Sequence, residues 1–278
     1  MIIWLSSYPK SGNTWVRSFL NSLLYIDNHS SDINDLKIRS FPNRKDLINL
    51  TTNIEDINDI IKHTLSAQSY LNQDKKIKFL KTHSANWRSN KYSFTDEKNT
   101  SSVIYIVRDP RNIVTSINNH FSFNNIEKAL DFMKDENKVI GNKNSKNEVD
   151  ILTVLSSWSN HYKSWKKIEK QYLLIKYENL LNNPKNEFQK ITNFLIKNHK
   201  FKINENEIVK SIENNNFENL RKQERLNGFG EAVKNKNGEP KTFFNLGPSN
   251  NWETILDPKI RQEIEKSFQN EMEELGYL

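Results

Sequence analysis

The sequence predicts an α/β fold, a single domain with a central parallel sheet flanked by helices. Apolar runs typical of strands alternate along the 278 residues with segments whose apolar residues recur at helical spacing. The run at 102–107 is nearly continuous in apolar residues, as expected for a strand buried on both faces of a parallel sheet. No linker rich in Pro, Gly or Ser divides the chain, so we expect one domain over residues 1–278.

The first part of the chain predicts strands separated by helices. The apolar residues 2–5 predict a strand, and the periodicity from Trp15 to Leu24 predicts the helix that follows it. A second helix is predicted from about residue 54 to residue 71, with its N-cap within 51–53. Residues 77–80 then predict another strand, which precedes the buried strand described above.

The later part continues the alternation. Residues 134–150 are polar, and we expect them to form a mobile excursion between helices. Apolar residues spaced from Ile151 to Trp165 predict a long amphipathic helix, and residues 172–177 predict a third buried strand. The remaining segments are helices over 184–196 and on to about 226, a loop over 227–250, and a last helix after Pro258.

The composition excludes several classes of site. The chain has no cysteine, which excludes disulfides, thiolate metal sites and a cysteine nucleophile. No signal-peptide core and no apolar span of about 20 residues is present, so we expect a cytoplasmic protein without a membrane span. The net charge of +7 suits an anionic ligand, but the lysines are scattered, so we expect no nucleic-acid partner.

Residues 7–15, Ser-Tyr-Pro-Lys-Ser-Gly-Asn-Thr-Trp, are the most informative run in the chain. They join the first predicted strand to the first predicted helix. The first N–H groups of a helix lack internal partners, and the helix dipole is positive there. Lys10 adds a cation to this helix end, while Ser11 and Thr14 add hydroxyl donors. The run therefore predicts a site for phosphate or sulfate.

This P-loop-like strand, loop and helix differ from the usual nucleotide-binding loop. That loop needs a glycine well before its lysine, whereas here Lys10 precedes Gly12. A plain ATPase is therefore disfavoured. The alternative is an ordinary turn in which Pro9 and Gly12 only shape the backbone.

Polar side chains also stand at the ends of the other predicted strands. Lys81 and His83 follow one strand, Arg108 follows the next, and Tyr177 ends the third. Because the carboxyl ends of parallel strands meet at one edge of a sheet, we expect these residues to lie with Lys10. Each has an ordinary alternative as a surface charge, a satisfied histidine or a core aromatic. Their joint placement favours a functional site.

The same segments carry a resemblance to a known family. Residues 8–15 resemble the phosphosulfate-binding loop, typically Tyr-Pro-Lys-Ser-Gly-Thr-Thr-Trp, of sulfotransferases that use 3'-phosphoadenosine 5'-phosphosulfate (PAPS). Only Asn13 departs from that pattern, and its side chain can still donate a hydrogen bond. Residues 81–83 look like the family's Lys-Thr-His segment, and residues 103–116 look like its 3'-phosphate segment. Residues 177–180 are similar to its Tyr-Glu-Asp-Leu.

The resemblance implies an enzyme that transfers the sulfuryl group of PAPS in line to an acceptor hydroxyl on a small molecule or glycan. It implies that Lys10 stabilises the leaving phosphate, that Lys81 contacts the sulfuryl oxygens, and that His83 is the general base. It also implies that Arg108 and Ser116 grip the 3'-phosphate. The full implied donor-binding set is Lys10, Ser11, Gly12, Asn13, Thr14, Trp15, Arg108, Ser116, Tyr177 and Phe217, the last with Trp15 and Tyr177 near the adenine. The reaction requires no metal, and we expect none.

One part of the family pattern is missing. Relatives commonly show Arg-Lys-Gly and then Gly-Asp-Trp near the C-terminus, but here Asn245 and Leu246 replace both cations, while Gly247 and Trp252 keep the frame. Nearby candidates to supply the missing positive charge are Arg221, Lys222, Arg225, Lys234 and Lys241. Two other functions stay open, a nucleotide-dependent kinase, which Asp109 keeps possible, and a nucleotide-binding protein that has lost catalysis.

Overall fold

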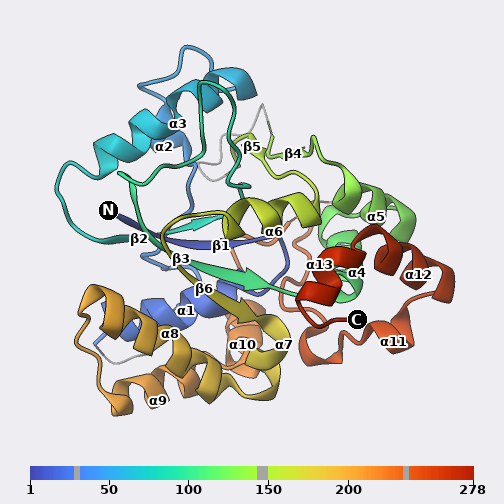
Figure 1. Ribbon diagram of the computed structural model, residues 1–278. Coiled ribbons are helices and arrows are strands. Elements are labelled where there is room, and N and C mark those ends of the chain that lie inside the picture. The colour runs from blue at the N-terminus through green and yellow to red at the C-terminus, as the bar shows by residue number, and fades with distance from the viewer. Residues whose placement is uncertain (28–31, 143–149, 234–237) are drawn as a thin grey trace. The chain divides into compact units, whose positions relative to one another are not determined.

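The chain forms two compact units. The computed structural model describes residues 1–27, 32–142, 150–233 and 238–278 (Figure 1). The first unit consists of Met1–Tyr8, Ile38–Val107 and Phe132–Leu174. The second consists of Pro9–Lys37, Arg108–Asp131 and Ile175–Leu278. The chain passes back and forth between the two units, so each unit is built from three separate segments of the sequence.

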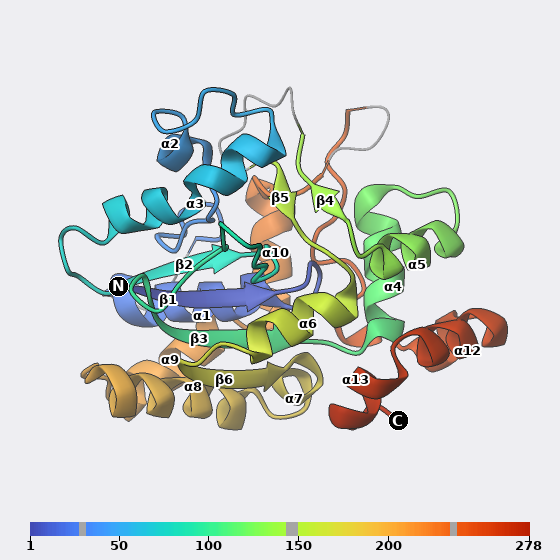
Figure 2. The ribbon, with the colours of Figure 1, turned by 45° about the horizontal axis from the view of Figure 1, so that its top comes forward.

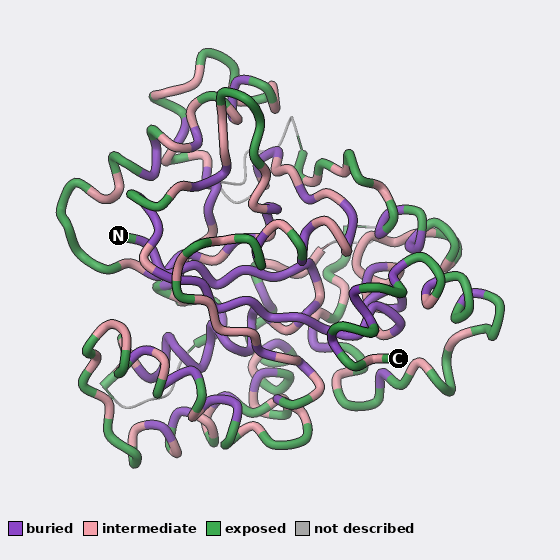
Figure 3. The backbone as a smooth tube through the Cα atoms, in the orientation of Figure 1, coloured by how far each residue is buried: buried purple, intermediate pink, exposed green. Residues whose placement is uncertain are grey.

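The first unit contains a four-stranded sheet in the order β2-β1-β3-β6. The strands are β1 (Ile2–Ser7), β2 (Lys78–Thr82), β3 (Thr100–Val107) and β6 (Gln171–Lys176). The central strand β1 pairs in parallel with both β2 and β3, which confirms the predicted parallel sheet. All six residues of β1 are buried, and the four apolar residues 2–5 are those that predict the strand (Figure 3).

Trp4 of β1 is the centre of an aromatic cluster in the first unit. Its ring lies 5.6 Å from Phe41, 5.2 Å from Phe94 and 6.1 Å from Trp165, measured between ring centroids. The rings meet at tilted angles, which aromatic pairs prefer over face-to-face stacking. The indole Nε1 donates to the Thr100 hydroxyl at 3.0 Å, so the buried polar atom is satisfied.

Helix α3 (Ile57–Leu71) begins later than predicted. Its N-cap is Asp56, whose carboxylate accepts from the Asn58 N–H, and not a residue within 51–53. The N–H groups of Thr52 and Asn53 instead donate to the carboxylate of Asp59. A carboxylate three residues into the helix therefore binds the preceding loop, and the cap moves to the next suitable side chain.

The predicted long helix from Ile151 is wrong in its first part. Helix α6 covers only Trp158–Lys166, and Ser157 caps it. Before it, β5 (Thr153–Val154) pairs antiparallel with β4 (Val139–Ile140). The spacing of apolar residues fitted a helix, but pairing with a distant segment decided the local structure.

The predicted polar excursion over 134–150 is therefore partly ordered. Its first residue ends helix α5 (Ile126–Lys134), and β4 lies within it. Residues 143–149 of this prediction lie outside the described residues. The short helix α2 (Arg44–Leu47) completes the elements of the first unit.

The second unit is mainly helical in its described residues, and it also includes residues 126–131 of α5 and residues 175–176 of β6. Its elements are α1 (Asn13–Tyr25), α4 (Pro110–Phe121), α7 (Tyr177–Asn182), α8 (Pro184–His199), α9 (Glu205–Asn214), α10 (Phe217–Asn227), a 3-10 turn η1 (Gly247–Ser249), α11 (Trp252–Ile255), α12 (Pro258–Ser267) and α13 (Gln269–Glu274). Helices α8 and α9 lie side by side, and α9 also packs on α1 (Figure 2). Phe19 of α1 stacks on Phe188 of α8 at 4.0 Å. The helices predicted over 184–196, up to about 226 and after Pro258 are confirmed.

Candidate functional site

The predicted phosphate-binding loop leads into helix α1 in the second unit. Gly12 is the N-cap, with a φ of 96°, and no side chain of a described residue caps this helix end. Lys10 also has a positive φ, 67°, which is uncommon for a residue with a side chain. Such backbone conformations are typical of functional loops, where surrounding contacts hold them in place. The start of α1 is thus a helix N-terminus, where the helix dipole favours an anion.

Gly12 is required by its contact with Tyr177. A Cβ atom added to Gly12 would lie 2.5 Å from Cδ2 of the Tyr177 ring, which is far too close. The same tyrosine ring meets Trp15 edge-on at 6.2 Å, and both aromatic residues are buried. The structure therefore brings the loop together with two of the predicted adenine-side residues.

Arg108 lies beside the same loop. One of its guanidinium nitrogens donates to the Lys10 carbonyl at 2.9 Å and reaches the Ser116 hydroxyl at 3.4 Å. The guanidinium carbon lies 4.2 Å from the Tyr177 ring centroid. The side chain is buried, and its Nε has no hydrogen-bond partner among the described residues.

No described carboxylate forms an ion pair with Arg108. The other two buried arginines of this unit each have one, because Arg111 pairs with Asp109 at 2.7 Å and Arg17 pairs with Glu231. An unpaired buried charge is costly, since burial removes its hydration. A buried guanidinium with an unsatisfied N–H is therefore what an anion-binding site requires.

Ser11 supplies a second unsatisfied donor in the loop. Its hydroxyl is buried and has no hydrogen-bond partner in the part of the chain that the structure describes. Buried hydroxyl groups are nearly always hydrogen-bonded, so this one also fits a missing polar ligand. Its neighbours Asn13 and Thr14 form the first turn of α1 and are buried.

Phe217 belongs to a group around the C-terminal loop. A Cβ atom added to Gly247 would lie 2.1 Å from its ring, and the ring packs edge-on against Phe244 at 6.2 Å. Phe243 belongs to the same C-terminal loop, and its ring centroid lies 3.6 Å from the Lys10 ammonium, a cation–π contact. The sequence analysis did not assign Phe243 a role. The one sequence feature that pointed to it is its position just before Asn245 and Leu246, which replace the family's two cations.

Among the residues that the structure describes, none directly replaces those cations. Asn245 and Leu246 are exposed. Of the candidates, Lys241 donates to the Asn119 carbonyl at 2.7 Å, at the end of α4. Arg221, Lys222 and Arg225 are exposed, and Lys234 lies outside the described residues.

His83 lies in the first unit, just after β2. Its Nδ1 donates to the backbone carbonyl of Ser7 at 2.8 Å. A proton on Nδ1 puts the lone pair of the neutral ring on Nε2, which makes Nε2 the atom able to accept a proton. Lys81 lies within β2, pairs with Leu5 in the parallel register and is half-buried.

His161 holds the backbone of His83 and was missed by sequence reasoning. Its Nε2 lies 3.2 Å from the His83 carbonyl, and the Tyr105 hydroxyl lies 2.8 Å from its Nδ1. Burial lowers the pKa of His161 to about 3, so the ring stays neutral. The neutral ring can therefore donate from Nε2 while it accepts from Tyr105. A histidine among apolar residues at helical spacing was the only signal in the sequence.

The predicted site residues thus fall into two groups. The loop from Lys10 to Trp15, with Arg108, Ser116, Tyr177 and Phe217, lies in the second unit, whereas Lys81 and His83 lie in the first. Along the chain, Ser7, whose carbonyl holds His83, precedes Lys10 by only three residues.

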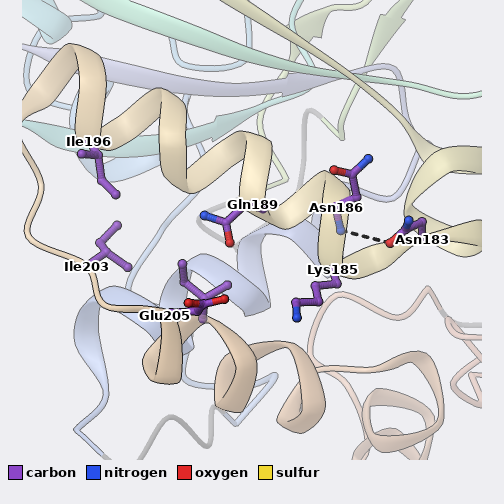
Figure 4. A pocket seen from close by; sticks show the side chains of 8 residues that line it. Asn183, Lys185, Asn186, Gln189, Ile196, Ile203 and Glu205 are labelled. Atoms are coloured by element: carbon purple, nitrogen blue, oxygen red, sulfur yellow. Dashed lines mark hydrogen bonds between the residues drawn. The ribbon is translucent and has the colours of Figure 1, made fainter.

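Other features of the described chain lie apart from these groups. An open pocket of about 610 Å³ lies between α8 and α9 (Figure 4). Its lining residues are Asn183, Lys185, Asn186, Gln189, Ile196, Ile203, Glu205 and Ile208, and no predicted site residue is among them. The described residues contain no group of three or more His, Asp or Glu side chains suited to a metal ion. None of the described helices has the length and apolar character needed to cross a bilayer.

Comparison with known proteins adds a family. The family model of the sulfotransferase domain matches residues 2–276. Sulfotransferase 1B1 of Canis lupus familiaris is 26% identical over 274 residues, which cover 97% of this chain and 83% of the relative. Sulfotransferase 1 family member D1 of Mus musculus is 24% identical over 283 residues, covering 98% and 83%.

Two solved structures share the fold. Mouse sulfotransferase SULT7A1, solved with PAP, superposes with a TM-score of 0.59 at 21% identity, over 97% of this chain and 84% of that one. Retinol dehydratase, solved with retinol and PAP, superposes with a TM-score of 0.61 at 19% identity, over 98% and 81%. These likenesses confirm the predicted α/β class with its central parallel sheet.

Proposed function

The chain belongs to the sulfotransferase domain family, and from this premise we propose that it transfers the sulfuryl group of PAPS to an acceptor hydroxyl. The observation that carries the proposal is the guanidinium of Arg108. It is buried beside the phosphate-binding loop, and it has no carboxylate partner in the described chain. A nucleotide with a 3'-phosphate supplies the missing anion. PAP, the nucleotide bound in the two solved structures, is what PAPS becomes when its sulfuryl group has left.

The residues of the second unit fit such a donor. In our proposal the N–H groups at the start of α1, the Ser11 hydroxyl and Lys10 bind the 5'-phosphosulfate. Arg108 and Ser116 bind the 3'-phosphate, and the aromatic rings of Trp15, Tyr177 and Phe217 border the adenine. Three buried donors of these residues lack partners in the described chain, namely the Ser11 hydroxyl, Arg108 Nε and Trp15 Nε1, and they support this assignment.

The transfer itself needs a base and a cation. PAPS supplies the sulfuryl group and the phosphate that leaves. His83 Nε2 accepts the proton of the acceptor hydroxyl as its oxygen bonds to sulfur. Lys10 stabilises the negative charge that develops on the leaving phosphate, and Lys81 contacts the sulfuryl oxygens. Removing one preorganised donor of this kind typically lowers the rate about 100- to 1000-fold.

We propose that the acceptor is a hydroxyl on a small molecule or a glycan, and that the protein acts in the cytoplasm. The solved relatives support the first part, because retinol dehydratase has been solved with retinol and with androsterone. Both ligands are alcohols.

Radiolabelled PAPS tests the proposal directly. The wild-type protein is incubated with the labelled donor and a panel of small-molecule alcohols and glycans, beside His83→Ala and, as a control, His199→Ala in helix α8. We expect labelled product from wild type and from His199→Ala, and at least a 100-fold lower rate from His83→Ala with little change in affinity for PAP. Equal rates for wild type and His83→Ala would remove His83 from the mechanism. Transfer of phosphate from ATP with Mg²⁺, and none of sulfate, would favour the kinase.

A further inference from the structure

Asn250 anchors the C-terminal loop to helix α4. Its side-chain amide donates to the Asn112 carbonyl at 2.8 Å and to the Ser116 hydroxyl at 3.1 Å. Its carbonyl oxygen accepts from the Thr115 hydroxyl at 2.9 Å. Nearby, the Trp252 N–H donates to the side chain of Asn112 at 3.0 Å. The side chain of Asn250 is buried, and all its hydrogen-bonding groups are used on α4.

The contact with Ser116 fixes the orientation of that hydroxyl. Its oxygen accepts from Asn250 on one side, and Arg108 lies 3.4 Å away on the other. Its own proton points back to the Asn112 carbonyl at 3.2 Å, a bond within α4. With both lone pairs facing donors, the O–H is the group that can turn from the Asn112 carbonyl to a ligand.

Residues 245 and 246 bring no charge to this hydroxyl. Asn245 and Leu246, at the positions of the usual Arg-Lys pair, are exposed and uncharged. Arg108 is the buried cation in contact with Ser116. An anion at this position therefore depends on one guanidinium and on how well the neutral donor beside it is oriented.

We propose that Asn250 is a positioning residue of the 3'-phosphate site and sets the preference of this protein for 3'-phosphorylated adenylates over 5'-AMP. This inference rests on the proposed function. Asn250 acts through Ser116, which it holds beside Arg108, and does not itself touch the phosphate. In relatives a cation pair from the C-terminal loop serves this position, whereas here an amide from the same loop orients the remaining donors.

Calorimetric titration of the protein with PAP and with 5'-AMP tests the inference without any catalytic turnover. The variants are Asn250→Ala and, as the matched control, its exposed neighbour Asn251→Ala, which removes only the cap of α11. We expect Asn250→Ala to weaken PAP binding about tenfold and 5'-AMP binding little, so the ratio of the two dissociation constants falls about tenfold. Asn251→Ala should keep the wild-type ratio.

The outcomes distinguish a failure of the proposed 3'-phosphate site from a failure of the role proposed for Asn250. A wild-type protein that binds PAP no better than 5'-AMP would overturn the proposed 3'-phosphate site itself. A wild-type preference for PAP that Asn250→Ala retains in full, or a loss that is equal for both ligands, would overturn only the role of Asn250. If Asn250→Ala gives no cooperative melting, Asn250→Asp keeps the bond to Thr115 but puts a negative charge beside Ser116. That variant should lose still more of the preference, and an unchanged ratio would also overturn the inference.

Discussion

Single residues in the phosphate-binding loop have little room to vary. Gly12 combines a positive φ with a ring packed against its Cα, and either feature alone would disfavour a side chain. Lys10 adopts a similar backbone conformation although it is not glycine. The loop therefore has a backbone conformation that is uncommon for residues with side chains and that is typical of ligand-binding sites.

Gly12→Ala separates the contact from the backbone conformation. We expect this variant to lose about 2 to 4 kcal/mol of unfolding free energy, because the new methyl group meets the Tyr177 ring, and to lose affinity for PAP. The control is Gly238→Ala, where φ is also positive, 84°, but nothing lies within 4 Å of the added Cβ. Denaturant unfolding of both variants measures the difference. Equal losses would mean that the contact with Tyr177 costs nothing.

The sequence predicts the candidate site through its residue types. The loop and the residues at the strand ends stand in short motifs, so a local pattern is enough to propose them. His161, Asn250 and Phe243 were not assigned a role, because each acts through a hydrogen bond or ring contact with a residue far away in the sequence. No local pattern records such a contact.

At the scale of elements, helix α4 connects the predicted 3'-phosphate residues to the C-terminal segments. Asp109 caps it by accepting from the Arg111 N–H at 2.9 Å, and the same carboxylate pairs with the Arg111 guanidinium. Arg111 continues the connection by donating to the Tyr277 carbonyl at 2.7 Å and by lying over the Trp252 ring. The cap of α4 and the attachment of the chain's C-terminal end therefore share one residue pair.

Asp109→Ala should be costly for this reason. The variant loses the cap and leaves buried Arg111 with Glu265 as its one remaining ion-pair partner among the described residues, so we expect a loss of about 3 kcal/mol in unfolding free energy. Asp257→Ala is the matched control, because Asp257 caps α12 in the same way but is exposed, and it should cost only about 1 kcal/mol. Urea unfolding measures both values. Similar losses for the two variants would show that the ion pair contributes nothing beyond the cap.

Elements were predictable where their own residues decide them. The strand at the N-terminus and helix α8 have uninterrupted local patterns, and both are where the sequence placed them. The start of α6 was wrong, because residues 153–154 pair with 139–140 across the chain. The start of α3 was wrong because Asp59 competes for the preceding loop.

For the whole molecule, buried titratable groups couple the fold to pH. His161 remains neutral in the folded protein with a pKa of about 3, whereas in the unfolded chain its pKa is near 6.5. Between these values the unfolded state binds more protons than the folded state. Stability from this group is therefore complete above pH 6.5 and is lost as the pH falls through that window.

His161→Asn should reveal this coupling. The variant is expected to be less stable than wild type at pH 7, since it loses the bond to the His83 carbonyl. Between pH 6.5 and pH 5, wild type should lose about 2 kcal/mol more than the variant, so the difference between them narrows. Urea unfolding across this pH range gives both slopes, and parallel slopes would exclude a neutral buried His161.

The family match covers residues 2–276 and so includes segments of both compact units. The chemistry proposed for the chain draws on both units, with the donor-binding residues in one and His83 in the other. Along the chain, the two groups of residues are connected by residues 7–10, because Ser7 accepts a hydrogen bond from His83 and Lys10 follows three residues later.

The central claim is that Arg108 is a buried cation awaiting the 3'-phosphate of an adenine nucleotide. Calorimetric titration of wild type and Arg108→Ala with PAP and with 5'-AMP tests it most directly. The claim predicts that wild type prefers PAP, and that Arg108→Ala loses about 10- to 100-fold in affinity for PAP but little for 5'-AMP. Equal losses for the two nucleotides, or wild-type binding of ATP with Mg²⁺ in preference to PAP, would contradict it.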